Sequence, residues 1–323
     1  MHTELITLDD IRAASARVSR IARLTELMDV SSHAGRTLLL KCESQQPGGA
    51  FKIRGAYNMV SQLSPDERRR GVITYSSGNH GQAMALAARE LGGPAVVVMP
   101  TTAPKVKIEG VKGFGAEVIF AGTTSTDRRL RAEAEAAARG LTMVPPFDHP
   151  WIVAGQGTAG LEILEQCPDV ATVLVPIGGG GLAAGVAAAV KLSRPDVKVV
   201  GVEPAGAAKM KSSLEAGHPV TLDRTDSIAD GLLPVRPGDL TFALVHRYVD
   251  DVVTVEDGQI IDAVLWLESS VRIVVEPSGA ASVAAALAGA GIPGPTVAII
   301  SGGNIDPERL EEFREARARS ARR

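Results

Sequence analysis

The chain has 323 residues, is 45% hydrophobic and 22% charged, and carries a formal net charge of −3 at pH 7. This is the composition of a folded globular protein that is long enough for two subdomains. The small negative charge gives no reason to expect a nucleic acid or an anionic membrane as a partner. Because the sequence has no apolar run of about 18 residues and no basic-plus-apolar leader, we expect neither a membrane-spanning helix nor a secretory signal.

The two cysteines indicate the compartment. Cys42 and Cys167 lie far apart, without a CxxC spacing or a cluster of cysteine and histidine. Such usage is typical of a reducing cytoplasm and gives no zinc signature. We therefore predict a cytoplasmic protein.

Short apolar runs alternate with helical periodicities along the first half of the chain. A helix begins at Thr7, a candidate N-cap, with Asp9 and Asp10 in its first turn. The strands expected next are 38–42, 72–75, 95–99 and 117–120, and the expected helices are 53–63, 83–91, 105–113 and 125–140. Strands that alternate with helices through short loops favour a parallel α/β sheet.

Pro145 and Pro146 interrupt this pattern, and the alternation then resumes. The second half predicts strands at 172–177, 197–203, 252–253 and 296–300, and helices that begin at 154, 182 and 257. We predict an α/β fold of two doubly wound, three-layer domains. Residues 1–64 and 150–323 form the large domain, and residues 65–149 form a small domain inserted into it.

Lys52 lies where a turn meets a helix. It follows Pro47-Gly48-Gly49 and the aromatic Phe51, and helix 53–63 begins directly after it. An amine that is partly desolvated near a helix N-terminus has a lowered pKa and can act as a nucleophile. Most single lysines in such a place are solvated residues of a first helical turn, so other parts of the chain must decide its role.

Four consecutive glycines, Gly178 to Gly181, separate a strand from a helix that begins at Leu182. Free backbone N–H groups at a helix N-terminus bind anions, so the run is a candidate phosphate cradle. Two alternatives stay open on this segment alone. Gly178 and Gly180 with Glu203 partly mimic a dinucleotide-binding fingerprint, and the run could instead be a structural turn.

Four motifs together carry a resemblance to a known family. They are Ser44-x-Gln46-x-Gly48-x-Ala50-Phe51-Lys52-x-Arg54-Gly55-Ala56, Ser76-Ser77-Gly78-Asn79-His80-Gly81-Gln82, the glycine run and Ser301-Gly302-Gly303-Asn304. In this order they resemble the tryptophan-synthase-β-like (fold type II) pyridoxal-phosphate enzymes, and within them the threonine/serine dehydratase and serine racemase branch. The likeness extends from Thr7 to Asp306 and implies that pyridoxal 5′-phosphate binds in the cleft between the two domains.

The resemblance implies a role for each matching residue. Lys52 matches the lysine that holds the cofactor as a Schiff base, with Phe51 beside the ring, and Asn79 matches the partner of the cofactor's 3-hydroxyl. The matches to the phosphate-binding backbone are Gly178, Gly179, Gly180, Gly181 and Leu182, and Ser301 matches the partner of the pyridine nitrogen. The loop that receives the substrate carboxylate is matched by Ser76, Ser77, Gly78 and His80. Arg128 lies where racemase-like relatives have a substrate-proximal arginine, although a solvated helix charge explains it equally well.

These residues predict a β-elimination. A free Lys52 amine can take the Cα proton while the cofactor ring accepts the electrons. The hydroxyl of Ser301 cannot keep the pyridine nitrogen protonated as a carboxylate could, which favours prompt loss of a β-hydroxyl over transamination. The expected reaction converts L-threonine or L-serine to a 2-oxo acid and ammonia.

Other activities remain as alternatives. Racemisation of serine needs proton transfer on both faces of the cofactor, and Ser77 matches the second proton donor of racemase-like relatives. Serine racemase or 3-hydroxyaspartate dehydratase activity is therefore the nearest alternative. A dinucleotide-dependent oxidoreductase is a more distant one.

The sequence departs from the family at a cation site. Relatives with a stimulatory divalent ion use a glutamate, a backbone carbonyl and an aspartate, and the matching positions here are Glu203, Ala207 and Lys209. A protonated lysine has no lone pair for a metal, so we predict no bound metal and expect the Lys209 ammonium to take the ion's place beside Glu203. A Lys209 that points to solvent is the alternative. From the resemblance we also expect a homodimer, and no C-terminal regulatory domain after Asp306.

Overall fold

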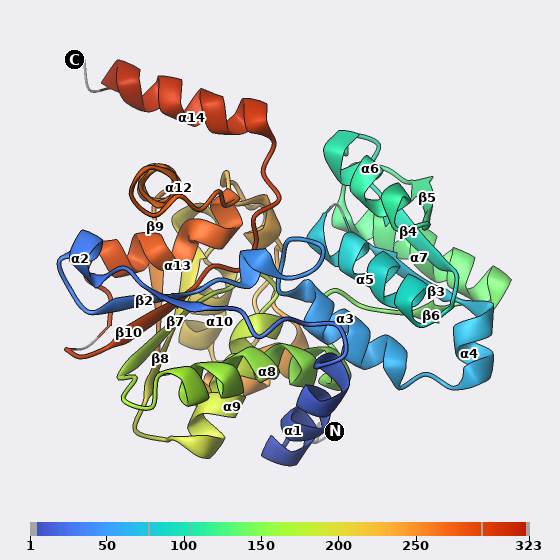
Figure 1. Ribbon diagram of the computed structural model, residues 1–323. Coiled ribbons are helices and arrows are strands. Elements are labelled where there is room, and N and C mark those ends of the chain that lie inside the picture. Colours follow the sequence, from blue (N-terminus) through green and yellow to red (C-terminus); the bar gives the residue numbers. More distant parts are fainter. Residues whose placement is uncertain (1–4, 77, 104, 292, 321–323) are drawn as a thin grey trace.

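The computed structural model describes residues 5–76, 78–103, 105–291 and 293–320. The described strands form one sheet of six and one of four, which lie side by side in Figure 1. No helix among the described residues is both long and apolar enough to cross a membrane.

The larger sheet has the order β1-β2-β10-β7-β8-β9, and every neighbouring pair is parallel except β1 and β2. Its strands are β1 (Leu27–Asp29), β2 (Leu38–Lys41), β7 (Thr172–Pro176), β8 (Lys198–Pro204), β9 (Asp251–Val255) and β10 (Thr296–Ile299). One face packs on α1 (Leu8–Val18), α8 (Pro150–Gln166), α9 (Gly181–Ser193) and α11 (Asp239–Tyr248), and the other on α12 (Asp257–Val271) and α13 (Pro277–Leu287). A parallel sheet needs this cover on both faces.

The smaller sheet is entirely parallel, in the order β5-β4-β3-β6. Its strands are β3 (Val72–Tyr75), β4 (Ala95–Met99), β5 (Glu117–Phe120) and β6 (Thr142–Met143). Helix α5 (Asn79–Glu90) packs on one face with α3 (Lys52–Ser61) and α6 (Lys105–Gly113), and α7 (Ser125–Arg139) covers the other. The remaining elements are α2 (Ser31–Ala34), α4 (Pro65–Arg70), α10 (Lys209–Ala216), α14 (Pro307–Ser320) and the 3₁₀ helices η1 (Glu43–Gln45), η2 (Ala205–Ala207) and η3 (Asp230–Leu232).

The α/β fold with its parallel sheets, as predicted from the sequence, is confirmed, and each predicted strand and helix is present. Elements β1, β6, α2, α4, α10, α11 and α13 were not predicted from the sequence, and some predicted elements differ at their ends. Helix α8 begins at Pro150 rather than at residue 154, because Pro150 stands in its first turn and the His149 side chain accepts a bond from the Trp151 N–H at 3.1 Å. Helix α5 also begins four residues earlier than predicted, at Asn79. The predicted cap of α1 is confirmed, since Thr7 and Asp10 form a capping box.

The strands between residues 72 and 143 form their own sheet, in keeping with an inserted domain at 65–149. Helix α3, however, buries its apolar face in the core of that sheet and also packs on α8. It therefore joins the two sheets, and the division at residues 64 and 150 stays a prediction.

A buried ion network fixes the start of α3. Arg54, which is fully buried, contacts Glu43 at 2.7 Å and Glu162 at 2.6 Å, and Lys41 lies 2.6 Å from Glu162. Two cations and two carboxylates give a neutral group, so no buried charge is left uncompensated. The network holds the helix whose first residue is Lys52.

Candidate active site

One cavity brings together the described residues that the sequence predicts for the site. It has a volume of about 540 Å³, and ligands of open α/β sheets bind at such places, beyond the carboxyl ends of the strands. The predicted residues in its wall are Phe51, Lys52, Ser76, Gly78, Asn79, His80, Arg128, Gly178, Gly179, Gly180, Gly181, Leu182 and Ser301. Ser77 lies outside the described residues.

The Lys52 amine is only partly exposed, and its Nζ donates to the Pro146 carbonyl at 2.7 Å. Burial lowers its pKa from 10.5 to about 8. At pH 7 roughly a tenth of this amine is therefore unprotonated, against less than about a thousandth of an ordinary lysine. The Nζ also lies 5.1 Å from the Phe51 ring centroid. Lys52 is thus held in the cavity in a state from which a nucleophilic amine is readily available.

His80 is a neutral neighbour of this amine. Its Nε2–H donates to the Val144 carbonyl at 3.1 Å, which leaves Nδ1 without a proton. Burial, and then the charge of Lys52, lowers the pKa of His80 to about 3. The imidazole is therefore neither a cation nor a donor for a carboxylate, and any part of His80 in substrate binding falls to its backbone in the first turn of α5.

The glycine run lies between β7 and α9 and is shaped by its neighbours. A Cβ on Gly179 would come within 2.3 Å of the Phe147 ring, and Gly180 has a φ of +100°, which side chains rarely adopt. The Thr241 hydroxyl donates to the Gly179 carbonyl at 2.7 Å and fixes the turn. No side chain of the described part caps the N-terminus of α9, so its first N–H groups face the cavity and suit an anion.

Asn79 is held from two sides by residues that the motifs did not single out as ligands. Its Nδ2 donates to Glu276 at 2.5 Å, and its Oδ1 accepts from Asn304 Nδ2 at 2.9 Å. Both contacts together fix which way the amide faces. One N–H of Asn79 then remains to donate to a ligand in the cavity.

Glu276 was missed because it stands in no motif. Its one sequence signal is Pro277, which marks the first turn of α13 and makes Glu276 the N-cap. The carboxylate is 3% exposed, lines the cavity, and lies beside Gly302, where a Cβ would meet it at 2.0 Å. It is the acidic group closest to Asn79.

Replacing Glu276 by glutamine is expected to remove a pH dependence of stability. Burial, and then Asp230, raises the pKa of Glu276 from 4.5 to about 7, against the opposing effects of Lys107 and Asn79. Between pH 4.5 and about 7 the folded protein binds more protons than the unfolded chain. The contribution of Glu276 to the free energy of unfolding is therefore complete below pH 4.5 and is lost as the pH rises through 7. The shift corresponds to about 3 kcal/mol. Denaturant unfolding of the cofactor-free protein from about pH 4.5 to 8 measures it, and parallel profiles for wild type and Glu276→Gln would contradict the assignment.

Lys209 is buried beside Glu203, as predicted, and not in solvent. Its Nζ lies 3.0 Å from Glu203 Oε1 and donates to the carbonyls of Ile177, Ala207 and Leu232 at 3.0, 3.0 and 2.9 Å. Both side chains are fully buried. A lysine ammonium surrounded by four oxygens thus ties the residue before the glycine run to η2 and η3.

Ser301 and an ion pair complete the wall. The Ser301 hydroxyl donates to the Ser278 carbonyl at 3.3 Å, and because the hydroxyl can rotate, the same proton can be donated instead to an acceptor in the cavity. Lys107, from α6, pairs with Asp230 in η3. This ion pair therefore links α6, which packs on the small sheet, to η3 in the part of the chain that contains the large sheet.

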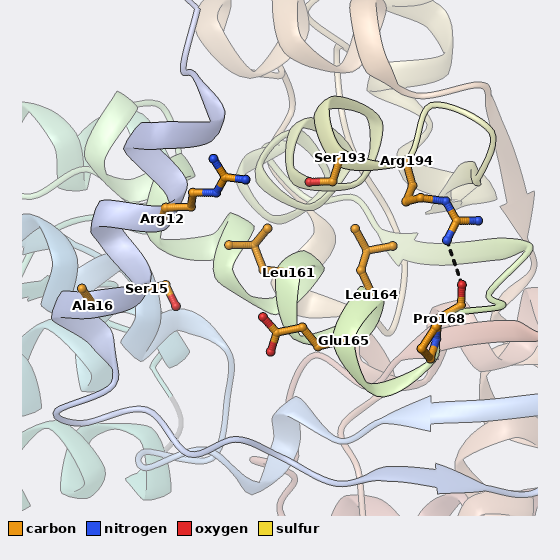
Figure 2. A pocket seen from close by; sticks show the side chains of 9 residues that line it. All are labelled: Arg12, Ser15, Ala16, Leu161, Leu164, Glu165, Pro168, Ser193 and Arg194. Atoms are coloured by element: carbon orange, nitrogen blue, oxygen red, sulfur yellow. Dashed lines mark hydrogen bonds between the residues drawn. The ribbon is translucent and has the colours of Figure 1, made fainter.

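A second hollow, of about 500 Å³, lies between α1, α8 and the end of α9 (Figure 2). Leu161 and Leu164 form part of its wall. Its two arginines already have carboxylate partners, since Arg12 lies 3.3 Å from Asp9 and Arg194 lies 2.6 Å from Asp196. It has none of the amine, glycine-loop or buried-carboxylate chemistry of the larger cavity.

A family model described as "Pyridoxal-phosphate dependent enzyme" matches residues 18–302. The chain belongs to this family. An L-threonine ammonia-lyase of Thermotoga maritima is 43% identical to this pyridoxal-phosphate enzyme over 96% of this chain and 78% of its own length. The solved structure of maize serine racemase matches with a TM-score of 0.91 at 37% identity, over 99% of this chain and 100% of that one. The chain spans about half (53%) of the biosynthetic threonine dehydratase of Escherichia coli, at 42% identity over 85% of this chain.

The residues present fit pyridoxal phosphate. The cavity combines a primary amine of lowered pKa with a glycine turn whose open N–H groups suit a phosphate. The alternative of a dinucleotide enzyme is wrong. Glu203, which would have bound a ribose, is fully buried, pairs with Lys209 and accepts the N–H groups of Met210 and Lys211.

Proposed function

We propose that this enzyme is an ammonia-lyase that converts L-threonine or L-serine to a 2-oxo acid and ammonia by α,β-elimination. The observation that carries the proposal is the Lys52 amine, with its pKa of about 8, in the same cavity as the glycine run. The similarity to an L-threonine ammonia-lyase over 96% of the chain supports the choice of substrate class.

When bound, pyridoxal phosphate supplies an aldehyde that takes an amine and a ring that accepts an electron pair. In this proposal Gly178 to Gly181 and Leu182 hold its phosphate, and the free N–H of Asn79 donates to its 3-hydroxyl. Phe51 lies beside the ring, and Ser301 faces the pyridine nitrogen. Each of these residues lies in the cavity wall.

Lys52 holds and moves the proton. As a free amine it takes the Cα proton, and as an ammonium it returns a proton to the departing β-hydroxyl. The Pro146 carbonyl, which accepts its hydrogen bond at 2.7 Å, orients the amine in both states. In this proposal the substrate carboxylate is bound at Ser76 and Gly78 and by the N–H groups at the start of α5, which no described side chain caps.

Ser301→Asp is expected to change the ratio of products, whereas Ser301→Ala should only lower activity moderately. A carboxylate at this place promotes protonation of the pyridine nitrogen and so stabilises charge on the ring for longer. The ratio of 2-oxo acid to side products, measured with L-serine, distinguishes the two variants. If Ser301→Asp leaves both rate and ratio unchanged, Ser301 does not face the nitrogen.

A 2-oxo-acid assay with L-threonine, L-serine, D-serine and both diastereomers of 3-hydroxyaspartate tests the proposal. We expect turnover of at least one L-β-hydroxy amino acid, together with a shift of the visible absorbance band when it is added. Chiral analysis of the remaining serine tests racemisation, the alternative that the similarity to maize serine racemase favours. Racemisation without release of 2-oxo acid would replace the proposed lyase activity.

We keep two further predictions as proposals. A cytoplasmic location is supported by Cys42 and Cys167, which are both free and buried. A homodimer rests on the family resemblance.

A further inference from the structure

One side of the active-site cavity is a run of four consecutive apolar residues at the end of η3, here called the apolar wall. Its members are Leu232, Leu233, Pro234 and Val235. Exposure rises along the run, from 5% at Leu232 to 40% at Val235. Leu232 lies deepest, beside the glycine run, where a Cβ on Gly178 would meet its Cδ2 at 3.7 Å. The apolar wall therefore extends from the glycine run outward to the solvent side of the cavity.

The backbone carbonyls of the apolar wall are bonded to other parts of the chain. Their donors are Lys209 Nζ at 2.9 Å for Leu232, the Thr225 hydroxyl at 2.8 Å for Leu233 and the Leu222 N–H at 2.9 Å for Val235. Pro234 has no backbone N–H to offer. The run thus presents apolar side chains to a ligand rather than hydrogen bonds, and these side chains take no part in the bonds that hold it in place.

The side of the cavity at the start of α7 is polar instead. It is lined by Thr123, Ser125, Thr126, Arg128 and Arg129. Arg128 is buried, so the solvated helix charge that the sequence allowed is wrong, and its Nε–H has no acceptor among the described residues. An apolar group laid over this side would exclude water from polar groups without replacing its hydrogen bonds. An apolar part of a substrate is therefore favoured on the apolar wall.

The proposed function leaves one substituent of the substrate Cα without a place. The amine goes to the cofactor aldehyde, the proton to Lys52, and the carboxylate to Ser76 and Gly78. The last two residues follow β3 of the small sheet, whereas the apolar wall lies beside Gly178, which follows β7 of the large sheet. The fourth substituent, the side chain, points away from the other three and can reach the apolar wall.

We propose that the apolar wall binds the β-substituent of the substrate, so that the favoured substrates are β-hydroxy amino acids with an apolar β-substituent larger than methyl, such as β-phenylserine or 3-hydroxyleucine. This inference rests on the proposed elimination. The Cα proton and the β-hydroxyl leave as water, and one water then returns to release ammonia. The net change is from β-phenylserine to 3-phenyl-2-oxopropanoate and ammonia, without an oxidant or reductant. Serine has no apolar group to place on the wall.

Substrate ranking tests the proposal. For the wild-type holoenzyme we expect a higher kcat/KM with one diastereomer of β-phenylserine than with L-threonine. The value for L-threonine should exceed that for L-serine by at least about 10-fold, because one carbon in an apolar pocket changes discrimination by about 10- to 200-fold. A higher value for L-serine or for 3-hydroxyaspartate than for β-phenylserine would overturn the inference.

Two variants make the apolar wall polar with little change of shape. Leu233→Asn should lower the ratio of kcat/KM for β-phenylserine to that for L-serine by about 10-fold or more. Val235→Thr, at the exposed end, should fold without difficulty and lower the same ratio by a smaller factor. The matched controls are Leu192→Asn and Val274→Thr, since Leu192 and Val274 are 39% and 50% exposed and do not line the cavity. Both controls should keep the wild-type ratio, and an unchanged ratio in both wall variants would contradict the proposal.

A binding measurement separates this inference from the catalytic proposal. L-Phenylalanine and L-alanine have no β-hydroxyl to lose and differ only in the phenyl group. At equal concentration L-phenylalanine should raise the melting temperature of the wild-type holoenzyme more than L-alanine, and Leu233→Asn should abolish the difference. Equal shifts with both amino acids would overturn the inference while the lyase proposal stands. If no amino acid is turned over, the lyase proposal fails, and the comparison of the two melting temperatures still decides whether the wall binds an apolar substituent.

Discussion

Lys52→Ala is expected to lower turnover of L-threonine or L-serine by at least about 10³-fold, because in the proposed function this side chain both holds the cofactor and takes the Cα proton. The side chain lies at the start of α3 and is not part of the ion network of Arg54, so the variant should fold. The visible absorbance of the bound cofactor should change at the same time. Assays of 2-oxo acid and absorbance spectra measure both effects.

An exposed lysine provides the control. Lys112 lies near the end of α6, is solvent-exposed and does not line the cavity, so Lys112→Ala should retain wild-type activity and spectrum. A primary amine added to the Lys52→Ala enzyme should restore a small part of the rate if only the base is missing. A Lys52→Ala enzyme with more than about a tenth of wild-type turnover would show that another group takes the proton.

Lys209→Met is expected to destabilise the protein by about 3–5 kcal/mol, the usual cost of removing one partner of a buried ion pair. The methionine fills a similar volume but leaves the Glu203 carboxylate and three carbonyl oxygens without their shared donor. Denaturant unfolding measures the loss. Adding Glu203→Gln to this variant should recover part of it, because the uncompensated charge is then gone.

The same lysine predicts how the protein responds to divalent ions. In the wild type the ammonium occupies the centre of the oxygen cluster, so a chelator should change neither activity nor melting temperature. Lys209→Asp exchanges the cation for a carboxylate, and oxygen ligands of this kind suit Mg²⁺ or Ca²⁺. This variant should therefore gain stability when either ion is added. Activation of the wild type by millimolar Mg²⁺, reversed by chelator, would contradict the role given to Lys209.

The site residues that could be predicted from the sequence are mainly those that lie within a recognisable motif. Lys52, Asn79, Ser301 and the glycine run were assigned from four short segments, and all of them line one cavity. The ion pair of Lys209 with Glu203 was also predictable, since the two lie six residues apart across a turn after a strand. In each case the chemical type of the residue and its position in the chain indicate the same role for the side chain.

Contacts between segments far apart in the chain were not predictable. Glu276 and Asn79 are 197 residues apart, and Lys107 and Asp230 are 123 apart, so neither pair has a spacing that a sequence pattern can show. Strand β1 was missed because it has only three residues and pairs antiparallel at the edge of the sheet. Arg128 is only 9% exposed and lines the cavity. Its burial depends on how the start of α7 faces the cavity, and a single arginine in a charged helix gives no sign of that in the sequence.

Borohydride reduction of the holoenzyme, followed by peptide mapping, tests most directly whether Lys52 holds the cofactor. The reduction fixes the cofactor to the amine that carries it, so the label stays on that residue through digestion. We expect the pyridoxyl label on the peptide that contains Lys52 and on no other lysine. A label on Lys107, Lys209 or any other lysine, or no label on a fully reconstituted enzyme, would contradict the account.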